Sequence, residues 1–516
     1  MGRFVIRGLI ALVFAILFPN PMPRAAAAAD GQLTWAAPFS ILPTFFDPAE
    51  YQGSISAMMT FYALHDALLK PMPGQAMAPG LAESWRVTPD GLTYEFVLRK
   101  NVRFHNGDVM TAHDVKFSFE RYRGTAAKRL KDQVAAVEVV DSHRLRIRLK
   151  EPWPDFMTFF GTPATGAAWV VPKAYVERVG DEGFKKAPVG AGPYRFVSFR
   201  PGVEVVLEAH EAFWRKVPTV KRLVFRSVPD DTTRLAMLKR GEVDIAYNLR
   251  GPLAEEVERT PGLKLTRAPL AATFWIDFAA GQWDPRSPWH DRRVRLAAAL
   301  AIDRPAINQT ETLGSSKLAG TIIPMGFEFA WPAPSIAYDP AQSRKLLAEA
   351  GYPNGFDAGD YTCDLPFASL GEAVVTYLGA VGIRARLRPL ERVAFMKYVQ
   401  EKKARHLLQV ASSSFGNAVT RIERHMVSGG DFAFGSYPEI DDLFARQARE
   451  PDRTKREAML HRIQVVAYER VMFAPVWQAA QLNGVRASID EPAIALIDYL
   501  PYSSPYEDLR VKPPLR

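Results

Sequence analysis

LAESWRVTPDGLTYEFVLRKNVRFHNGDVMTAHDVKFSFER, residues 81–121, contains several local folding signals in close succession. From Trp85 to Arg99, hydrophobic and polar side chains alternate on either side of the turn-forming sequence PDG at 89–91. This pattern predicts a β-hairpin with one buried face. Thr111 then lies three residues before Asp114. That is the spacing of a capping box, and it predicts that a helix begins there.

The chain that follows this stretch alternates between strand-like and helix-like segments. VEVVLE (203–208), RLVFRSV (222–228) and EVDIAY (242–247) are typical of strands, and a predicted helix from Asp231 ends at Gly241. Further helices are predicted at 340–350, 369–381, 440–449 and 453–470, with a strand at 383–387. Strands and helices joined by short loops indicate an α/β fold in which helices flank a sheet.

Length and composition limit the class of protein. The chain has 516 residues, of which 48% are hydrophobic and 23% are charged. This length predicts two to four domains, and the composition argues against wholesale disorder. The net charge is +9, but 65 basic and 56 acidic residues make a mixed surface rather than a polycation. Composition therefore gives no support to a nucleic-acid partner, and none is expected.

The first 29 residues are predicted to be a signal peptide that is cleaved after Ala29. Arg3 and Arg7 precede the hydrophobic run Leu9–Phe18, and Ala25–Ala29 supplies small residues for cleavage. A membrane anchor is the alternative, but a span needs ~20 hydrophobic residues, about twice the length of this run. Cleavage would remove three of the 65 basic residues, so the exported chain would carry a net charge near +6.

Cys363 is the one cysteine of the sequence. An internal disulfide is therefore impossible, and an N-terminal lipid-bearing cysteine is not expected after the signal peptide. An exported protein without disulfides or lipid suits a bacterial periplasm. A catalytic thiol would need a histidine partner that the sequence does not locate, so we interpret Cys363 as a buried residue.

Four blocks of sequence, in order along the chain, resemble one protein family. Besides 81–121, they are APVGAGPYRF (187–196), FWIDFAAGQWDPRSPWHDRRVRLAAALAIDRPAI (274–307) and YDPAQSRKLLAEAGYPNGF (338–356). The chain resembles the family-5 extracellular solute-binding proteins, which are the oligopeptide-, dipeptide- and nickel-binding components of ABC importers.

This resemblance implies an α/β periplasmic-binding-protein-like clamshell, with two mixed α/β lobes, a hinge and an inserted third domain. Domain I would comprise 30–73, 189–286 and 478–516, domain II would comprise 74–188, and domain III would comprise 287–477. The chain would cross between lobes near 286 and 477, and the ligand would be enclosed between domains I and III when the hinge closes.

The resemblance also implies ligand-contacting side chains at two kinds of position. Aromatic residues that match the lining of the family's cleft are Trp169, Phe274, Trp275 and Phe415; for each of them, core packing is the alternative. Polar residues that match the family's first cleft-facing loop are Gln52, Ser54 and Ser56, for which a solvated loop is the alternative.

A further candidate segment is 412–417, which contains Ser412, Ser413, Ser414, Phe415 and Asn417. Peptide-binding members of the family carry an acidic residue here that pairs with the α-ammonium group of the peptide, whereas this chain has none. Because a buried ammonium group without a counter-charge is costly, either another acid substitutes or the ligand has no free α-amine. We favour the second interpretation, which suits a neutral polar ligand or an anion. Arg384, Arg386 and Arg388 are interpreted as a solvent-facing strand edge.

Dedicated catalytic and metal-binding motifs are not evident. His105, Asp108 and His113 fit a turn and a helix cap better than a metal site, and no H-E-x-x-H, nucleophile-elbow or phosphate-loop spacing occurs. We therefore expect no metal, no cofactor and no enzymatic activity. The predicted function is that of a monomeric periplasmic protein that captures a small polar ligand and delivers it to the permease subunits of an ABC importer. An exported hydrolase and a periplasmic chaperone are the alternatives.

Overall fold

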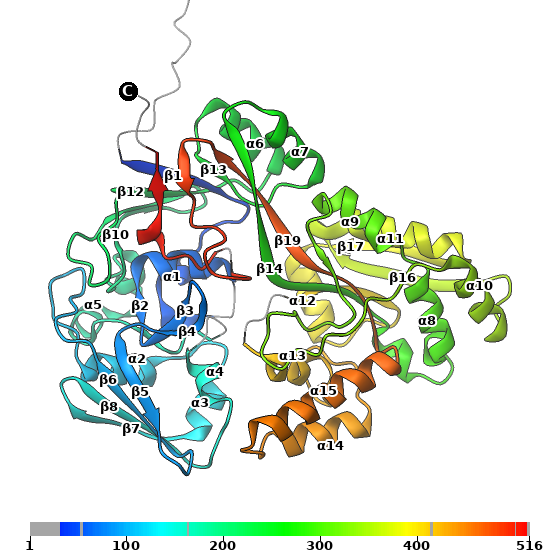
Figure 1. The fold of residues 1–516 in the computed structure, drawn as a ribbon, viewed down its shortest axis with the longest axis horizontal. Helices are drawn as coiled ribbons and strands as arrows, with labels where there is room; N and C mark the ends of the chain where they lie inside the picture. The colour runs from blue at the N-terminus through cyan, green and yellow to red at the C-terminus, as the bar shows by residue number, and fades with distance from the viewer. Residues whose placement is uncertain (1–30, 52–54, 162–164, 413–415, 501, 513–516) are drawn as a thin grey trace, which may run out of the picture.

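The computed structural model describes residues 31–51, 55–161, 165–412, 416–500 and 502–512. Two lobes lie side by side and are connected by a pair of long strands, β14 (Leu263–Asp277) and β19 (Phe473–Arg486) (Figure 1). We call the described parts of 31–262 and 487–512 the first lobe, and those of 278–472 the second lobe. Segments from both ends of the chain therefore build the first lobe.

A mixed sheet runs through both lobes. Among the described residues it has eleven strands, ten of them in the order β10-β11-β12-β1-β13-β19-β14-β18-β16-β17, while β15 pairs with β19. The remaining strands of this sheet are β1 (Gln32–Ala37), β10 (Tyr194–Arg200), β11 (Glu204–Ala209), β12 (Arg222–Ser227), β13 (Ile245–Ala246), β15 (Lys317–Leu318), β16 (Phe356–Asp364), β17 (Ile383–Leu390) and β18 (Leu407–Ser412).

The two connecting strands belong to both halves of this sheet. β14 and β19 are antiparallel, and their pairing runs from Leu263 opposite Arg486 to Asp277 opposite Phe473. β19 pairs with β13 of the first lobe, whereas β14 pairs with β18 of the second lobe over Thr273–Asp277. The register shifts between Pro269 and Thr273. Rotation of one half of the sheet against the other would therefore be concentrated in this pair of strands.

The rest of the first lobe contains smaller sheets and seven helices within the described residues. The strands are β2 (Asp66–Ala67), β3 (Leu69–Met72), β4 (Gln75–Pro79), β5 (Ala82–Val87), β6 (Thr93–Leu98), β7 (Val134–Asp141), β8 (Arg144–Leu149), β9 (Trp169–Val170), β20 (Ile489–Glu491) and β21 (Arg510–Val511). The helices are α1 (Met58–Leu64), α2 (Ala112–Arg121), α3 (Ala127–Gln133), α4 (Phe156–Gly161), α5 (Lys173–Lys186), α6 (Asp231–Arg240) and α7 (Gly251–Arg259).

The predicted hairpin and capping box are confirmed in this lobe. β5 and β6 are antiparallel neighbours, with Trp85 opposite Phe96. The backbone N–H of Thr111 donates to Asp114 Oδ2 at 2.8 Å at the start of α2. The predicted strand 242–247 is shorter than expected, because the carboxylate of Asp244 accepts from the N–H of Thr34 at 2.8 Å, in place of a backbone carbonyl.

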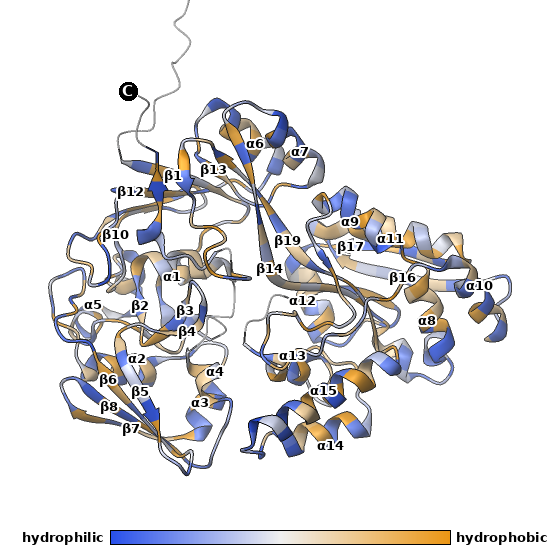
Figure 2. Cartoon of the chain, in the orientation of Figure 1, coloured by the Kyte–Doolittle hydropathy of each residue, from blue (hydrophilic) through white to orange (hydrophobic). Residues whose placement is uncertain are grey.

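Helices cover the second lobe's part of the sheet. In the described chain they are α8 (Arg292–Leu300), α9 (Arg304–Thr312), α10 (Pro340–Glu349), α11 (Ala368–Ala380), α12 (Arg392–Gln400), α13 (Ala418–His425), α14 (Pro438–Gln447) and α15 (Arg453–Glu469). The helices predicted in this region are thus confirmed to within about two residues at each end. α14 and α15 carry both hydrophobic and hydrophilic residues along their length, as helices with one buried face do (Figure 2).

Two main hydrophobic cores support the arrangement. One extends from the first lobe across to α13 and α15, and the other lies between β16, β17 and the helices α8 and α11. β17 lies at the edge of the sheet, where Arg386 and Arg388 are paired with Asp360, so the interpretation of these arginines as a solvent-facing edge is confirmed. Within the described chain, no helix combines the length and apolarity needed to cross a membrane.

Candidate functional site

The boundary between the lobes contains a buried polar contact. Asp155, which precedes α4 in the first lobe, is 2% exposed. Its Oδ1 accepts from Asn417 Nδ2 at 2.9 Å, and its Oδ2 forms an ion pair with Arg456 of α15. Both partners belong to the second lobe. Because a buried carboxylate is stable only when it is paired and hydrogen-bonded, this contact favours the arrangement in which the lobes touch.

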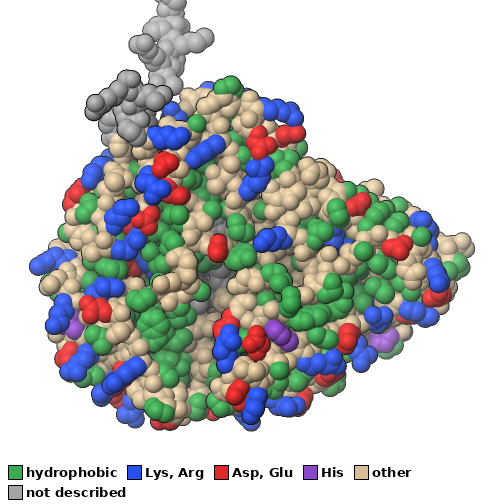
Figure 3. All heavy atoms as spheres, in the orientation of Figure 1, with side chains coloured by type: hydrophobic (Ala, Val, Ile, Leu, Met, Phe, Trp, Pro, Cys, Tyr) green, Lys and Arg blue, Asp and Glu red, His purple; other side chains and the backbone are tan. Residues whose placement is uncertain are grey.

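Two further contacts join the lobes around this boundary. Arg129 of α3 forms an ion pair with Glu423 of α13, and its guanidinium lies 4.5 Å from the centroid of the Phe159 ring. On the C-terminal segment, the ring of Tyr499 packs closely against Gly326, where a Cβ atom would collide with it. The surface is hollowed along the line between the lobes (Figure 3). We regard this boundary as the candidate functional site.

Trp169 lies in the core of the first lobe. It belongs to β9 and is 4% exposed. Its ring packs against Phe61 and Tyr62 at centroid distances of 5.7 and 5.3 Å, and Lys70 Nζ lies 5.7 Å from its centroid. These contacts account for its burial through packing, and its contact with a ligand stays a prediction.

Phe274 and Trp275 lie in different hydrophobic cores, and the register of β14 against β19 shifts between them. Phe274 packs against Phe367 and Trp477 in the core of the second lobe. Trp275 belongs to the core that extends across both lobes, and its ring contacts His425. Trp275 Nε1 is buried without a hydrogen-bond acceptor. Trp275 is therefore the better placed of the two toward the boundary between the lobes.

Ser412 and Asn417 flank the rest of the predicted polar segment. Ser412 ends β18, where it lies opposite Thr273, and Asn417 is the N-cap of α13, whose side chain accepts from the N–H of Val419 at 3.1 Å. Asn417 thus both caps a helix and touches the opposite lobe. Ser56 lies in a short 3-10 turn before α1. Gln52, Ser54, Ser413, Ser414 and Phe415 lie outside the described residues, so their roles stay predictions.

The structure adds Arg421, which the sequence analysis did not single out. Arg421 lies in α13, is 0% exposed and packs beside Trp275, with its guanidinium 5.7 Å from the ring centroid. Burial lowers the pKa of this guanidinium to about 9, with a smaller contribution from the nearby Arg424. Since an arginine on a helix is usually exposed, no signal in the sequence marks this one as buried.

His425 follows Arg421 by one helical turn and is also buried. Its ring stacks on Phe432 at 5.3 Å, and its Nε2 has no hydrogen-bond partner. Burial holds the pKa of His425 well below its usual range, and the nearby Arg421, Arg424 and Lys402 lower it further. Cationic and potentially cationic side chains thus gather around α13.

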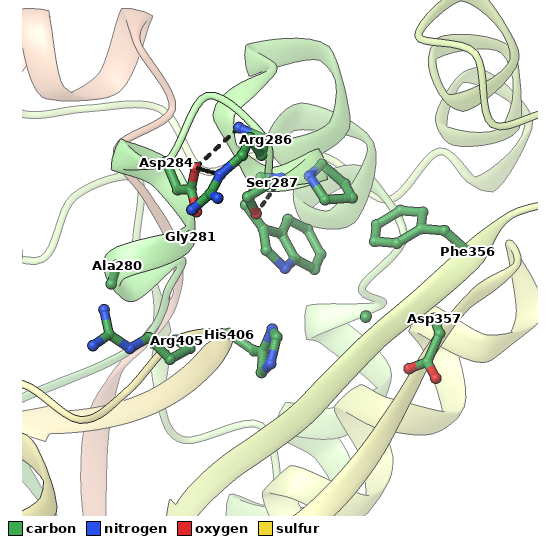
Figure 4. A pocket seen from close by; sticks show the side chains of 12 residues that line it. Ala280, Gly281, Asp284, Arg286, Ser287, Phe356, Asp357, Arg405 and His406 are labelled. Carbon is green, nitrogen blue, oxygen red and sulfur yellow. Dashed lines mark hydrogen bonds and ion pairs between the residues drawn. The ribbon is translucent and has the colours of Figure 1, made fainter.

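A separate cavity of about 780 Å³ lies within the second lobe alone. It is lined by residues of the 280–289 segment, the start of β16 and the pair Arg405 and His406. Asp284 and Arg286 form an ion pair with each other at its rim (Figure 4). None of the predicted site residues that the structure describes lines this cavity.

The described residues contain no group of three or more His, Cys, Asp or Glu side chains that could hold a metal ion. Cys363 is buried as interpreted from the sequence, and burial raises the pKa of its thiol to about 11. A protonated, buried thiol is a poor nucleophile.

Comparison with known proteins identifies relatives over most of the chain. A family model described as "Bacterial extracellular solute-binding proteins, family 5 Middle" matches residues 76–429. The glutathione-binding protein GsiB of Escherichia coli (strain K12) is 28% identical over 417 residues, which cover 77% of this chain and 79% of that protein.

Solved structures share the fold. The periplasmic binding protein DppA from Helicobacter pylori, in complex with the peptide STSA, matches with a TM-score of 0.76 and 21% identity over 94% of this chain and 98% of that one. MoaA from A. tumefaciens R10, in complex with mannopinic acid, matches with a TM-score of 0.76 and 23% identity over 94% of this chain and 100% of that one. The predicted α/β clamshell fold is thereby confirmed.

Proposed function

Because the chain belongs to the family-5 bacterial extracellular solute-binding proteins, we propose that it captures a small polar ligand between its two lobes and releases it to the permease of an ABC importer. The class of function, substrate binding for an ABC transporter, is that of the family and its relatives. The place of capture, the chemistry of the ligand and the partner permease are the proposal.

The observation that carries this proposal is the way in which the lobes are joined. Two adjacent strands connect them, and a buried carboxylate, Asp155, binds Asn417 and Arg456 across the boundary. A ligand that touches both lobes would favour closure by its differential affinity for the closed state. A permease could then distinguish the loaded protein from the empty one by its shape.

The domain boundaries, the export route and the assembly state belong to the same proposal. We expect domain I to comprise 30–73, 189–286 and 478–516, domain II to comprise 74–188, and domain III to comprise 287–477. The signal peptide 1–29 is expected to direct the chain to the periplasm and to be removed there. The mature protein is expected to act as a monomer, without a cofactor and without catalysis.

The ligand is expected to lack a free α-amine, because the segment 412–417 contains no acidic residue. The relatives bind chemically different molecules: one is named for glutathione, one was solved with a peptide and one with mannopinic acid. The family alone therefore does not select the ligand. The described residues that we expect to contact it are Ser56, Trp169, Phe274, Trp275, Ser412 and Asn417.

Native mass spectrometry of the protein purified from its own host tests this function. We expect one small molecule per chain, released unchanged when the protein is unfolded, and ordinary dipeptides or tripeptides that do not displace it. The same ligand added back at one hundred times its Kd should stabilise the fold by ~2.7 kcal/mol.

The alternatives predict different results from the same preparation. A hydrolase would convert the added molecule to products and retain none of it in stoichiometric amount. A chaperone would bind unfolded chains and show no saturable binding of a small molecule. Either result would overturn the proposed function.

A further inference from the structure

Arg421 is a buried cation for which no described residue supplies an anionic partner. Its Nη1 donates to the carbonyl oxygen of Ile322 at 2.8 Å, and its Nη2 donates to that of Ser412 at 3.0 Å. The Nε–H has no acceptor among the residues that the structure describes, although the side chain is fully buried. The aromatic rings of Trp275 and Phe327 lie 5.7 and 5.8 Å from the guanidinium. Two carbonyl oxygens are a poor set of partners for a group with five N–H donors and a full charge.

Other buried arginines of this chain show what a purely structural role looks like. Arg234 donates four hydrogen bonds to backbone carbonyl oxygens, and Arg304 also donates four, although its Nη2 has no partner in the described chain. Arg295 donates four to carbonyl oxygens and a fifth to the hydroxyl of Tyr437. Each of them ties loops together through many acceptors. Arg421 has half as many or fewer, so a structural role leaves much of its hydrogen-bonding capacity unused.

The side chains next to Arg421 add donors and positive charge. Arg424 is the charged group that acts most strongly on Arg421, and within the described chain no carboxylate has a comparable effect. Thr273 and Trp275 are two positions apart on β14, and both Thr273 Oγ1 and Trp275 Nε1 are buried without a hydrogen-bond partner among the described residues. A hydroxyl, an indole N–H and a guanidinium N–H are therefore all available to an acceptor, and unsatisfied buried donors of this kind are rare in folded proteins.

The position of Arg421 links this group to the boundary between the lobes. A helical side chain extends toward the N-terminus of its helix, and the contact of Arg421 with Ser412 O shows that its guanidinium lies near the start of α13. At that same end, Asn417 binds Asp155 of the first lobe. The N-terminal end of a helix also carries a partial positive charge, which favours an anion.

We propose that Arg421 binds a carboxylate group of the transported ligand, with Thr273 and Trp275 as neighbouring donors. This inference rests on the proposed function and names the chemical class of its ligand: a small organic acid. Arg421 is then a specificity-determining residue. A guanidinium matches the planar carboxylate with two parallel N–H···O bonds, and here the Nε–H is free to make one of them. The absence of an acidic residue from 412–417 agrees with an anion at this end of α13.

Thermal unfolding of the mature chain with matched pairs of probes tests the proposal. The pairs are sodium acetate and acetamide, sodium gluconate and gluconamide, and N-acetyl-Ala-Ala with its C-terminal amide, all at constant sodium chloride. We expect the acid of at least one pair to raise the melting temperature saturably, and its amide to need at least a tenfold higher concentration. Arg421→Met, which keeps an unbranched side chain against Trp275 and Phe327, should abolish that preference, and Arg421→Lys should weaken it.

Arg386→Met is the matched control, because Arg386 lies on the exposed edge strand β17 and pairs with Asp360; it should keep the preference for the acid. Should Arg421→Met fail to fold, Arg421→Lys provides the comparison. The proposal is overturned if acids and amides act alike, if no acid acts saturably, or if Arg421→Met keeps the preference. A neutral probe that binds saturably at the same concentration as its acid, or at a lower one, would overturn the carboxylate alone and leave the solute-binding function intact.

Discussion

Burial in the folded protein shifts the pKa values of two histidine side chains, His65 and His105. His65 is 0% exposed, and its Nε2 lies 2.9 Å from the carbonyl oxygen of Phe46. Burial lowers the pKa of His65 to about 4, and burial also lowers the pKa of His105 to about 3. His105 accepts from the N–H of Gly190 at 3.2 Å and lies 3.0 Å from Gly192 O. The folded chain therefore needs both imidazoles to be neutral.

These histidines predict a loss of stability in acid. An unfolded histidine takes up a proton near pH 6.5, whereas folded His65 stays neutral down to about pH 4. Between these values the unfolded state binds more protons, so the free energy of unfolding falls as the pH falls, by up to ~3 kcal/mol for His65. We expect His65→Gln to flatten this decline in urea unfolding measured from pH 7 to pH 4.

His113→Gln is the control for that series, because His113 is exposed on α2, and it should leave the pH dependence unchanged. An equal decline in wild type and His65→Gln would show that His65 does not contribute to acid sensitivity.

The sequence indicated some residues of the candidate site and missed another. It selected Trp275 and Asn417, which the structure places at or near the boundary between the lobes. It also selected Phe274, whose contact with a ligand stays a prediction, and it passed over Arg421. Propensity gives no reason to bury an arginine, and only the long-range approach of Ile322 and Ser412 to α13 accounts for it.

At the scale of elements, the sequence predicted those hairpins and helix ends that depend on residues close together along the chain. The hairpin of β5 and β6 and the capping box of α2 follow from turn residues and capping side chains within a few positions of one another. The turn at 187–196 is different. Its sequence matched a family pattern, but the reason for its glycines appears only in the structure, since they pack against the end of α1.

We expect replacement of Gly190 and of Gly379 by alanine to have opposite effects on the free energy of unfolding. A Cβ atom on Gly190 would lie 2.5 Å from His65 Nδ1 and closer still to Leu64 O, whereas one on Gly379 of α11 would meet nothing within 4 Å. We expect Gly190→Ala to lower the free energy of unfolding by about 1–3 kcal/mol through overpacking. Gly379→Ala should raise it by up to about 1 kcal/mol, because alanine is the better helix former.

Urea unfolding of the two variants beside wild type checks this pair. Stability of Gly190→Ala equal to that of wild type would contradict the close approach of the turn to α1. A lower free energy of unfolding for Gly379→Ala than for wild type would show that the space beside Gly379 of α11 is not open.

At the scale of the whole molecule, the sequence predicted two lobes through family resemblance, whereas the residue pairs that join them could not be derived locally. Leu263 lies opposite Arg486, far apart along the chain, and no periodicity within either strand identifies its partner. The boundaries predicted near 286 and 477 stay predictions. In the structure, the sheet changes register between Pro269 and Thr273.

We expect the contact of Asp155 with the second lobe to stabilise the closed arrangement of the lobes relative to the open one. Replacing it by asparagine leaves Arg456 buried without its counter-charge as long as the lobes touch, and a broken buried pair costs about 3–5 kcal/mol. Opening relieves that cost, so we expect Asp155→Asn to shift the protein toward the open state and to weaken ligand binding at least tenfold. Titration calorimetry with the co-purified ligand measures the loss.

Asp181→Asn is the control for this variant, since Asp181 pairs with Arg121 and Arg123 inside the first lobe; it should bind as wild type does. Equal affinity of Asp155→Asn and wild type would show that the Asp155 contact does not stabilise the closed state.

Small-angle X-ray scattering of the mature chain, first emptied of ligand and then saturated with the molecule that co-purifies from the host, tests the central claim most directly. A protein that captures its ligand between two lobes, joined by β14 and β19, should contract. We predict a smaller radius of gyration on saturation and a larger one for ligand-free Asp155→Asn than for ligand-free wild type. An unchanged radius of gyration at full saturation would contradict capture by closure of the lobes.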